Sequence, residues 1–309
     1  MSESKLIVVT PAKNEAVYLP VTIASMLKQS VLPSEWIIVD DGSTDGTGEI
    51  ARSAAAAHPW ITVTRRDSDP GRRVGLATVH AIQIALAQTR VVDFDYLCVI
   101  DADVDLPPAY FASLLSEFDR QSALGIAAGQ IYERGLGGKL QPMRGAPEAT
   151  AGAVKCWRRR CFEEIGGVID EAGWDGIDQY QAALHGWSTR TFDGEGFRVL
   201  HLRPVGSSHK GVLHGRLRRG RSGYHMGSHP LWMLASSLFH LSDPPILLGS
   251  LFTLWGYFQA QCKGVPRIDN GRLIAFIRAR QLAILRAGFC SPLLRFFSSV
   301  KESLSWQPR

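Results

Sequence analysis

Three acidic side chains follow a short apolar run near the middle of the chain. Leu97–Ile100 is long enough for a buried strand, and Asp101, Asp103 and Asp105 come directly after it. Side chains alternate between the two faces of a strand, so Asp101 and Asp103 point the same way if the extended geometry continues. Two close carboxylates repel unless a cation lies between them, and carboxylate oxygens are ligands for Mg²⁺ or Mn²⁺. We expect a metal site here; the alternative is a solvated acidic turn before a helix.

Alternating strands and helices are expected to position these acids. The apolar runs predict strands at 5–10, 36–39, 61–65 and 97–100. Helices are expected at about 15–28, 74–87 and 110–118, and another is capped by Ser43, Thr44 or Asp45 and continues to about residue 57. This spacing is typical of a parallel sheet with right-handed crossovers, which binds ligands beyond the carboxyl ends of its strands. Polar clusters follow three of these strands, at Pro11–Glu15, Asp40–Asp45 and Asp101–Asp105. We therefore expect all three clusters at one edge of the sheet.

The last third of the chain has a different composition. Residues 231–262 are apolar and aromatic, and the run 246–260 is shorter than the roughly 20 residues that span a bilayer. The segment is expected either to form a buried helical hairpin or to lie in a membrane surface. We predict two domains, an α/β domain that carries the polar clusters at 1–215 and a helical region at 216–309.

Charge and cysteine content limit the possible partners. The chain of 309 residues has a formal net charge of +5 and a pI of about 9.0. A basic surface can meet nucleic acid, anionic lipid or a phosphorylated substrate, but no nucleic-acid motif is present, so no nucleic-acid partner is expected. Five scattered cysteines without a Cys-x-x-Cys pair favour reduced thiols, and no signal peptide is recognised. We expect a cytoplasmic protein.

Three motifs, in this order, resemble the inverting nucleotide-sugar glycosyltransferases of the GT-A fold, glycosyltransferase family 2, which includes cellulose, chitin and hyaluronan synthases. They are Val9–Glu15, Ile38–Thr47 with its Asp-Asp-Gly-Ser-Thr-Asp run, and Asp101-Ala102-Asp103. The resemblance extends from about residue 5 to residue 192. It implies an α/β fold with a Rossmann-like, mostly parallel sheet flanked by helices. The C-terminal α-helical, apolar and basic appendage would be specific to a subfamily.

The resemblance also implies a nucleotide-sugar site. In this family, the loop after the first strand holds the nucleotide, and the acid after the second strand bonds the base, which is usually uracil. The residues carried over to these roles are Thr10, Pro11, Glu15 and Asp41, with Asp40 as a neighbour. Asp101 would contact the ribose or the metal, and Asp103 the Mg²⁺ or Mn²⁺ that bridges the diphosphate. Arg72, or its neighbour Arg73, is a candidate for the base or phosphates of a UDP- or GDP-linked donor.

The catalytic base of the family is an acid in a Glu-Asp pair at a helix N-terminus. The equivalent here is Trp174-Asp175, in which the first acid is missing. We expect Asp175 to be the base, with Asp178 as the alternative. A single base that takes the proton of the acceptor hydroxyl allows attack on the opposite face of the sugar, which inverts the anomeric centre. Trp174 is expected to stack on a sugar ring of the acceptor.

Residues downstream of the base differ from the polymer-forming members. The chain lacks their Gln-x-x-Arg-Trp motif and has a basic run at 216–221 instead, in which Arg218 or Arg219 is a candidate clamp for the diphosphate. His201 or His209 is a candidate for a further metal or phosphate ligand, although a single histidine is more often structural. The missing motif favours transfer of one sugar over extrusion of a polymer.

The leading hypothesis is therefore a metal-dependent, inverting hexosyltransferase. It would move one sugar to a glycan or a lipid-linked acceptor in cell-surface polysaccharide synthesis, with peripheral contact to the inner face of the cytoplasmic membrane. A nucleotidyltransferase is the alternative enzyme, but it would carry a Gly-rich phosphate loop that Pro11–Glu15 does not provide. The alternative that is not an enzyme is a catalytically silent scaffold protein with the same fold.

Overall fold

The chain divides into two compact units, Met1–His209 and Lys210–Arg309. The computed structural model describes residues 4–67, 76–135, 138–171, 173–204, 211–243 and 245–304, with side chains up to residue 287. The expected boundary at residue 215 falls inside α7 (Val212–His225), the first helix of the second unit.

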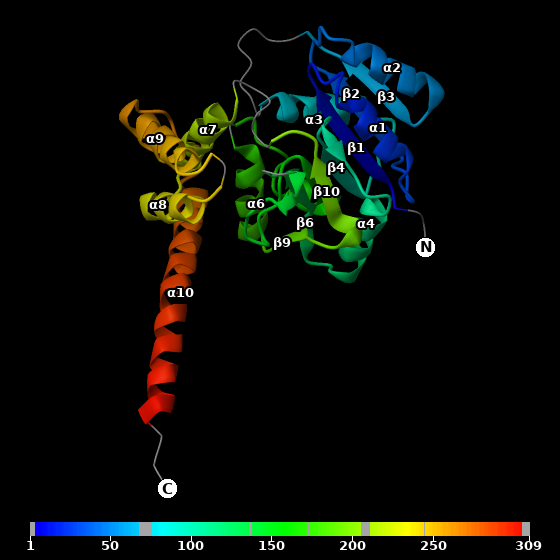
Figure 1. The fold of residues 1–309 in the computed structure, drawn as a ribbon. Helices are drawn as coiled ribbons and strands as arrows, with labels where there is room; N and C mark the ends of the chain where they lie inside the picture. The colour runs from blue at the N-terminus through cyan, green and yellow to red at the C-terminus, as the bar shows by residue number, and fades with distance from the viewer. Residues whose placement is uncertain are drawn as a thin grey trace. The chain divides into compact units, whose positions relative to one another are not determined.

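A mixed sheet forms the centre of the first unit (Figure 1). Its spatial order is β3-β2-β1-β4-β8-β6-β10-β5, and β7 and β9 also pair with β6. The strands are β1 (Leu6–Ala12), β2 (Glu35–Asp40), β3 (Ile61–Arg65), β4 (Tyr96–Ile100), β5 (Val104–Asp105), β6 (Leu124–Arg134), β7 (Leu140–Pro142), β8 (Val154–Arg158), β9 (Ser188–Phe192) and β10 (Arg198–His201). The first four strands pair in parallel, as the alternation of strands and helices predicted.

Two details of the sheet differ from the sequence-based expectation. β1 was expected to end at Pro11, but it continues to Ala12, with Pro11 paired to Val39. The pairing of β1 with β4 stops at Val9, so Pro11 lies where this strand has a free edge and its missing N–H costs no ladder bond. The second difference is β8, which was not predicted and lies antiparallel between β4 and β6.

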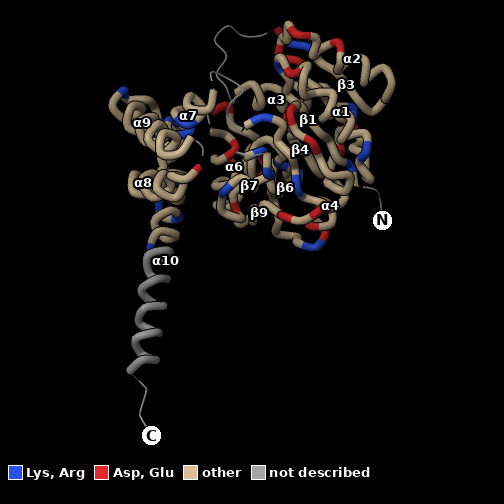
Figure 2. The backbone as a smooth tube through the Cα atoms, viewed as in Figure 1, with Lys and Arg blue, Asp and Glu red and all other residues tan. Residues whose placement is uncertain are grey.

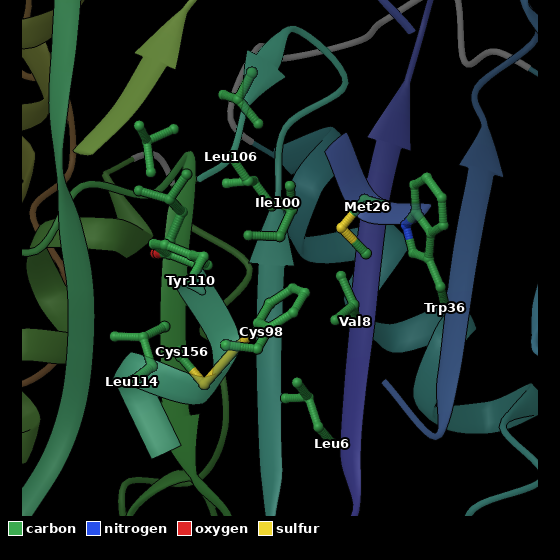
Figure 3. Packing of buried hydrophobic residues seen from close by; sticks show 14 of the residues in the cluster. Leu6, Val8, Met26, Trp36, Cys98, Ile100, Leu106, Tyr110, Leu114 and Cys156 are labelled. Atoms are coloured by element: carbon green, nitrogen blue, oxygen red, sulfur yellow. A yellow bond between two sulfur atoms is a disulfide. The ribbon is translucent and has the colours of Figure 1, made fainter. Parts of the chain in front are cut away.

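Helices cover both faces of the sheet. One face packs against α1 (Leu19–Leu27), α2 (Thr47–Ala57) and α4 (Tyr110–Arg120), and the other against α3 (Leu76–Gln88), α5 (Arg159–Glu164) and α6 (Trp174–Leu184). Side chains of β1 alternate between the two, since Leu6 and Val8 lie in one core and Ile7 and Val9 in the other. Figure 3 shows the first of these cores. Burial on both faces explains why the central strands are apolar throughout.

Cys98 and Cys156 form a disulfide between adjacent strands (Figure 3). They are directly paired residues of β4 and β8, and both lie in the core. The sequence-based expectation of reduced thiols throughout is therefore wrong for this pair. The pairing could not be inferred from spacing, because it depends on the unpredicted strand β8.

The second unit is helical, with α7, α8 (Pro230–Phe239), α9 (Leu248–Cys262) and α10 (Gly271–Leu304). α7 and α9 pack very closely because glycines face the neighbouring backbone. A Cβ on Gly220 would lie 1.9 Å from the carbonyl oxygen of Thr253, and one on Gly256 would lie 2.1 Å from that of Leu217. Among the residues that the structure describes, no helix combines the length and the apolar character needed to cross a bilayer.

Candidate active site

Polar residues from four strands meet at the carboxyl edge of the sheet. β1, β2 and β4 run in parallel and end at Ala12, Asp40 and Ile100, and the acidic clusters follow these ends. β10 is parallel to β6, which two antiparallel steps across β8 place in the same direction as β4. His201 therefore arrives at the same edge from a distant part of the sequence.

Asp101, Asp103 and His201 form a cluster with the geometry of a metal site. Each offers one ligand atom, and these atoms lie within 4.8 Å of one another. Nδ1 of His201 lies 2.7 Å from the carbonyl oxygen of Arg203, a contact that favours the proton on Nδ1 and leaves Nε2 as a ligand. His201 Nε2 is 3.7 Å from an Asp103 carboxylate oxygen. Two carboxylates and one imidazole suit a divalent cation such as Mg²⁺ or Mn²⁺.

Arg203 joins two of the acids in this region. Its Nε donates to Asp103 Oδ2 at 2.6 Å, and its Nη2 donates to Glu15 Oε1 at 2.5 Å. Its guanidinium also lies over the ring of Tyr18, 5.4 Å from the centroid. This arginine thus connects the end of β10 to the acids that follow β1 and β4.

When ionised, Asp101, Asp103 and Glu15 would together carry more negative charge than the single positive charge of Arg203 balances. Burial raises the pKa of Asp101 to about 8, and repulsion from Asp103 and Glu15 acts in the same direction. Burial also raises the pKa of Glu15 to about 7, although the hydrogen bond and the charge of Arg203 oppose that rise. Within the described part of the chain, Glu15 Oε2 is buried without a hydrogen-bond partner. A divalent cation at this edge would relieve both features.

Asp41 is buried at the end of β2, beside the loop that follows β1. Its Oδ1 accepts a hydrogen bond from Arg66 Nε at 2.5 Å, and its backbone N–H donates to the carbonyl of Ala12 at 2.8 Å. Lys13 Nζ donates to the Asp41 carbonyl at 3.0 Å. These contacts hold Asp41 at the edge where the family resemblance places the nucleotide base.

The neighbouring acid Asp40 has contacts typical of a structural residue. It is fully buried, its Oδ1 accepts from the backbone N–H of Ser43 at 2.8 Å, and its Oδ2 accepts from Arg65 at 3.0 Å. Thr47 Oγ1 accepts from the backbone N–H of Glu15 at 2.7 Å, so the loops after β1 and β2 are bonded to each other. Asp40 therefore orders the turn that presents Asp41.

Thr10 does not reach the nucleotide side of this edge with its side chain. It is fully buried, and its hydroxyl oxygen accepts a hydrogen bond from Trp36 Nε1 at 2.9 Å. The hydroxyl of Thr10 therefore serves a core hydrogen bond, and a contact of this loop position with the nucleotide stays a prediction. Pro11, one residue further, has an intermediate exposure at the strand end.

Asp175 lies in the first turn of α6, next to the loop that leads into β8. A Cβ on Gly152 would lie 3.1 Å from the Asp175 Cβ, and the next residue, Ala153, accepts a hydrogen bond from the backbone N–H of Asp101 at 2.8 Å. The charge of Asp175 contributes to the raised pKa of Asp101. Within the described residues no hydrogen bond or ion pair occupies the Asp175 carboxylate, and it is partly exposed. It can therefore accept a proton from a ligand at this edge.

Asp178 has a different environment from Asp175, although both belong to α6. It is 1% exposed, and its carboxylate accepts from Lys155 Nζ at 2.8 and 3.0 Å and from Trp157 Nε1 at 3.0 Å. Burial raises its pKa to about 6, while the charge of Lys155 opposes the rise. Lys155 Nζ also donates to the backbone carbonyl of Asp175 at 2.5 Å. The buried Lys155–Asp178 pair thus fixes the helix start that carries Asp175.

Trp174 is a core residue in this structure. It is 5% exposed, its ring centroid lies 5.9 Å from that of Trp157, and Lys155 Nζ lies 5.3 Å from the same ring. The expected stacking of Trp174 on an acceptor sugar needs an accessible ring face, so the structure contradicts it. The indole of Trp174 packs beside Trp157 of β8 and so belongs to the core of the first unit.

The remaining four predicted residues are Arg72, His209, Arg218 and Arg219. Arg72 and His209 lie outside the described residues. Arg218 and Arg219 belong to α7 in the second unit, where Arg219 Nη2 lies 3.2 Å from His240 Nε2. Their proposed contact with a diphosphate stays a prediction.

Sequence reasoning missed Arg66, Lys155 and Arg203. Arg203 had a usable signal, because it follows His201 by two residues just after the apolar run 197–202, and alternate residues of an extended segment face the same way. Arg66 had a weaker signal, as it directly follows the predicted strand 61–65. Lys155 had none, because a lysine in a basic segment is expected to be exposed.

Comparison with solved structures identifies the fold. The structure matches the mannosyltransferase PcManGT from Pyrobaculum calidifontis, which was solved with GDP-Man and Mn²⁺. The match covers 94% of this chain and 81% of that protein, with a TM-score of 0.52 and 17% sequence identity. It also matches GalNAc-T7, solved with UDP, GalNAc and Mn²⁺, over 78% of this chain and 51% of the other, with a TM-score of 0.51 and 17% identity. The curled sheet flanked by helices is the GT-A glycosyltransferase fold.

The sequence comparisons then identify the family. Residues 7–180, more than half of the chain, match glycosyl transferase family 2, and the chain belongs to that family. A curated relative, the undecaprenyl-phosphate mannosyltransferase of Micrococcus luteus, is 32% identical over 111 residues. That alignment covers 36% of this chain and 43% of the relative, so the chain matches less than half of that protein.

Proposed function

We propose that this chain is a metal-dependent, inverting glycosyltransferase that moves a single sugar from a UDP- or GDP-linked donor to a lipid-linked acceptor. The observation that carries the proposal is the cluster of Asp101, Asp103 and His201, whose ligand atoms lie within 4.8 Å at the edge where the other polar loops meet. Family membership supports sugar transfer over nucleotidyl transfer. A catalytically silent scaffold of the same fold would not need the cluster of Asp101, Asp103 and His201, because it would bind no metal for catalysis.

Asp101, Asp103 and Nε2 of His201 are the residues that would hold Mg²⁺ or Mn²⁺. A cation held there would stabilise the negative charge of the leaving diphosphate. Arg203 is bonded to Asp103 and Glu15 and keeps these two carboxylates oriented before the donor binds. Asp41 bonds the base, with Glu15 and Pro11 near the nucleotide. Arg72, Arg218 and Arg219 are further candidates for the phosphates, and His209 is an alternative to His201 as a ligand.

Asp175 is the proposed general base. Its carboxylate accepts the proton of the acceptor hydroxyl while the oxygen attacks the anomeric carbon from the side opposite the diphosphate, so the configuration is inverted in one step. Asp178 is less suited to this role, because its oxygens are already bonded to Lys155 and Trp157.

The donor and acceptor are inferred from the chemistry of similar proteins. The curated relative and one of the solved structures described above are mannosyltransferases, and that structure was solved with GDP-Man. GDP-mannose is therefore the first donor to test, followed by UDP-linked sugars. The curated relative is named for a polyprenyl phosphate acceptor. A lipid-linked acceptor would suit the basic and apolar second unit and a role in cell-surface polysaccharide synthesis.

The proposal is tested by measuring release of nucleoside diphosphate from a panel of GDP- and UDP-sugars, with polyprenyl phosphate as acceptor, with and without Mn²⁺. We expect release with one donor class, dependent on Mn²⁺, and a product of inverted anomeric configuration. Release of pyrophosphate from a nucleoside triphosphate and a sugar phosphate would instead identify a nucleotidyltransferase. A complete lack of turnover across the panel, without donor binding, would favour the silent scaffold.

Stabilisation by Mn²⁺ is expected to increase as the pH rises from 6 to 8. The raised pKa values of Asp101, about 8, and Glu15, about 7, mean that the folded protein without metal binds more protons than the unfolded chain. Its free energy of unfolding should therefore fall as the pH rises towards 8, whereas metal binding needs the deprotonated acids and should strengthen. Thermal unfolding measured with Mn²⁺ and with chelator should show a larger difference in Tm at pH 8 than at pH 6. An equal difference at both pH values would contradict this account of the site.

Asp41→Ala is expected to raise the Kd for the donor about tenfold or more. We expect a rise of this size because Asp41→Ala removes a hydrogen bond to a charged group, and such a bond contributes about 1.5–3 kcal/mol to binding. Calorimetry with GDP and UDP in the presence of Mn²⁺ measures the effect. Glu49→Ala is the matched control, because Glu49 is an exposed acid on the following helix, paired only with Arg52 in the described structure. Unchanged affinity of the Asp41 variant for both nucleotides would show that Asp41 does not contact the base.

A further inference from the structure

Large apolar side chains point outward from the two central helices of the second unit. On α8 these are Leu231, Leu234 and Leu238, and on α9 they are Leu251, Trp255 and Phe258; together we call them the outer face of the α8–α9 hairpin. The spacing within each helix, three or four residues, places each set on one side. Leu251 is 58% exposed and Trp255 is 62% exposed. Single exposed apolar residues are ordinary, but several large ones on the same side of a helix mark an interaction surface.

The opposite side of α9 carries small and polar residues. Its buried positions include Gly249, Ser250, Thr253 and Gly256, and the two glycines Gly220 and Gly256 allow close contact between the backbones of α7 and α9. Ser250 donates to the carbonyl of Ser237 on α8 at 2.7 Å. A helix of a protein dissolved in water normally buries its large apolar residues and exposes its polar ones. Apart from Tyr257, which is buried, α9 has the reverse arrangement, with small residues between helices and large apolar residues outside, which is typical of helices surrounded by lipid.

The α8–α9 hairpin has far fewer charged residues than the rest of the chain. Residues 230–262 contain one acidic residue, Asp243, and no lysine or arginine. The whole second unit, residues 210–309, has fourteen Lys and Arg and three Asp and Glu, which gives a net charge of +11. Residues 1–209 have twenty Lys and Arg and twenty-six Asp and Glu, which gives a net charge of −6. Figure 2 shows α8 and α9 almost entirely in tan and basic residues on α7. Two copies of a unit with this charge would repel each other, so a second copy is a poor occupant of the outer face.

We propose that the outer face of the α8–α9 hairpin lies in the interfacial layer of an anionic lipid bilayer. The apolar side chains enter the boundary between headgroups and acyl chains, Trp255 and Phe258 supply the aromatic contacts favoured at that depth, and the basic residues of the unit attract anionic headgroups. α9 has 15 residues and is about 22 Å long, shorter than the roughly 30 Å hydrocarbon core, so the hairpin lies in the surface. The inference rests on the second unit alone and does not depend on the proposed sugar transfer.

The full chain should co-sediment with vesicles of phosphatidylglycerol and phosphatidylcholine, and less so at high salt or with phosphatidylcholine alone. Leu251→Ser together with Trp255→Ser should weaken binding roughly tenfold to a hundredfold, because both remove apolar area that enters the lipid. The matched control is Leu32→Ser together with Val92→Ser, which removes similarly exposed apolar side chains from the first unit and should leave binding unchanged.

A second measurement locates the contact and does not depend on the double variant folding. Vesicles with brominated acyl chains should quench part of the tryptophan fluorescence of the wild type, and Trp255→Phe should lose that part while still sedimenting. Absence of binding to anionic vesicles at low salt would overturn the proposal, as would equal loss in the control variant. A dimer in solution that the Leu251→Ser and Trp255→Ser changes dissociate would assign the face to a second copy instead. None of these measurements contains a donor, so they can fail or succeed independently of the enzyme assay.

Discussion

Asp175→Asn is expected to lower kcat by roughly a hundredfold to ten-thousandfold, the usual range for loss of a general base. Asparagine keeps the size of the side chain but cannot accept the proton of the acceptor hydroxyl. The carboxylate makes no hydrogen bond or ion pair within the described residues, and the start of α6 is held by the bond from Lys155 to the backbone carbonyl. The fold and the Kd for the donor should therefore stay close to wild type. Steady-state kinetics and donor calorimetry on the same preparation measure the two quantities.

Asp178→Asn is the matched control, because it makes the same chemical change three residues further along the same helix. It weakens the buried pair with Lys155, and breaking such a pair by removing one partner costs about 3–5 kcal/mol of stability. The loss should appear as a lower Tm, while the folded fraction keeps a kcat much closer to wild type. If the Asp178 variant were inactive while folded and the Asp175 variant active, the two roles would have to be exchanged.

Asp103→Ala should lower turnover by about a thousandfold or more and should remove its dependence on Mn²⁺. The carboxylate is one of three ligand groups in the cluster, and charge stabilisation by a bound cation contributes several kcal/mol to such a reaction. The variant should also weaken Mn²⁺ binding, which titration followed by electron paramagnetic resonance measures without any turnover. Because Asp103 is buried and bonded to Arg203, its loss should also lower the Tm without metal, so both proteins are compared at a temperature at which they are folded.

Asp105→Ala is the control for the metal prediction. Asp105 belongs to the same acidic run, but it lies on β5, paired with Leu200, and is not part of the ligand cluster. Its loss should leave Mn²⁺ affinity unchanged and activity near wild type. Full activity of the Asp103 variant, or of the wild type in chelator, would contradict the assignment of a metal site to this edge.

The sequence by itself determined the class of fold and the edge at which its polar residues gather. The strands β1 to β4 are short apolar runs whose side chains are buried on both faces, a signal that needs no tertiary information. Asp41, Asp101 and Asp103 follow directly after such strands, and parallel strands bring their carboxyl ends to one edge. The three motifs together were specific enough to predict the family that the comparison then established.

Tertiary structure decided which residues complete the site. Arg203 meets Glu15 across 188 positions of sequence, and His201 meets Asp103 because β10 pairs with β5, which places His201 opposite Val104. Such contacts depend on the order of strands in the sheet, which local sequence patterns do not encode. The same reason applies to β8: it contains Lys155 and Trp157, and only its position between β4 and β6 shows that the lysine is buried against Asp178.

The burial of β8 also gives the two candidate bases and Trp174 different environments. From the sequence, Asp175 and Asp178 are both acids near a helix start, and Trp174 is an aromatic residue beside them. Once Lys155 takes the carboxylate of Asp178 and Trp157 covers the indole, Asp175 is the acid of this turn that can still accept a proton from a ligand. Sequence placed the chemistry at the edge of the sheet, and long-range packing assigned each side chain to the site or to the core, because burial depends on neighbours that are distant in sequence.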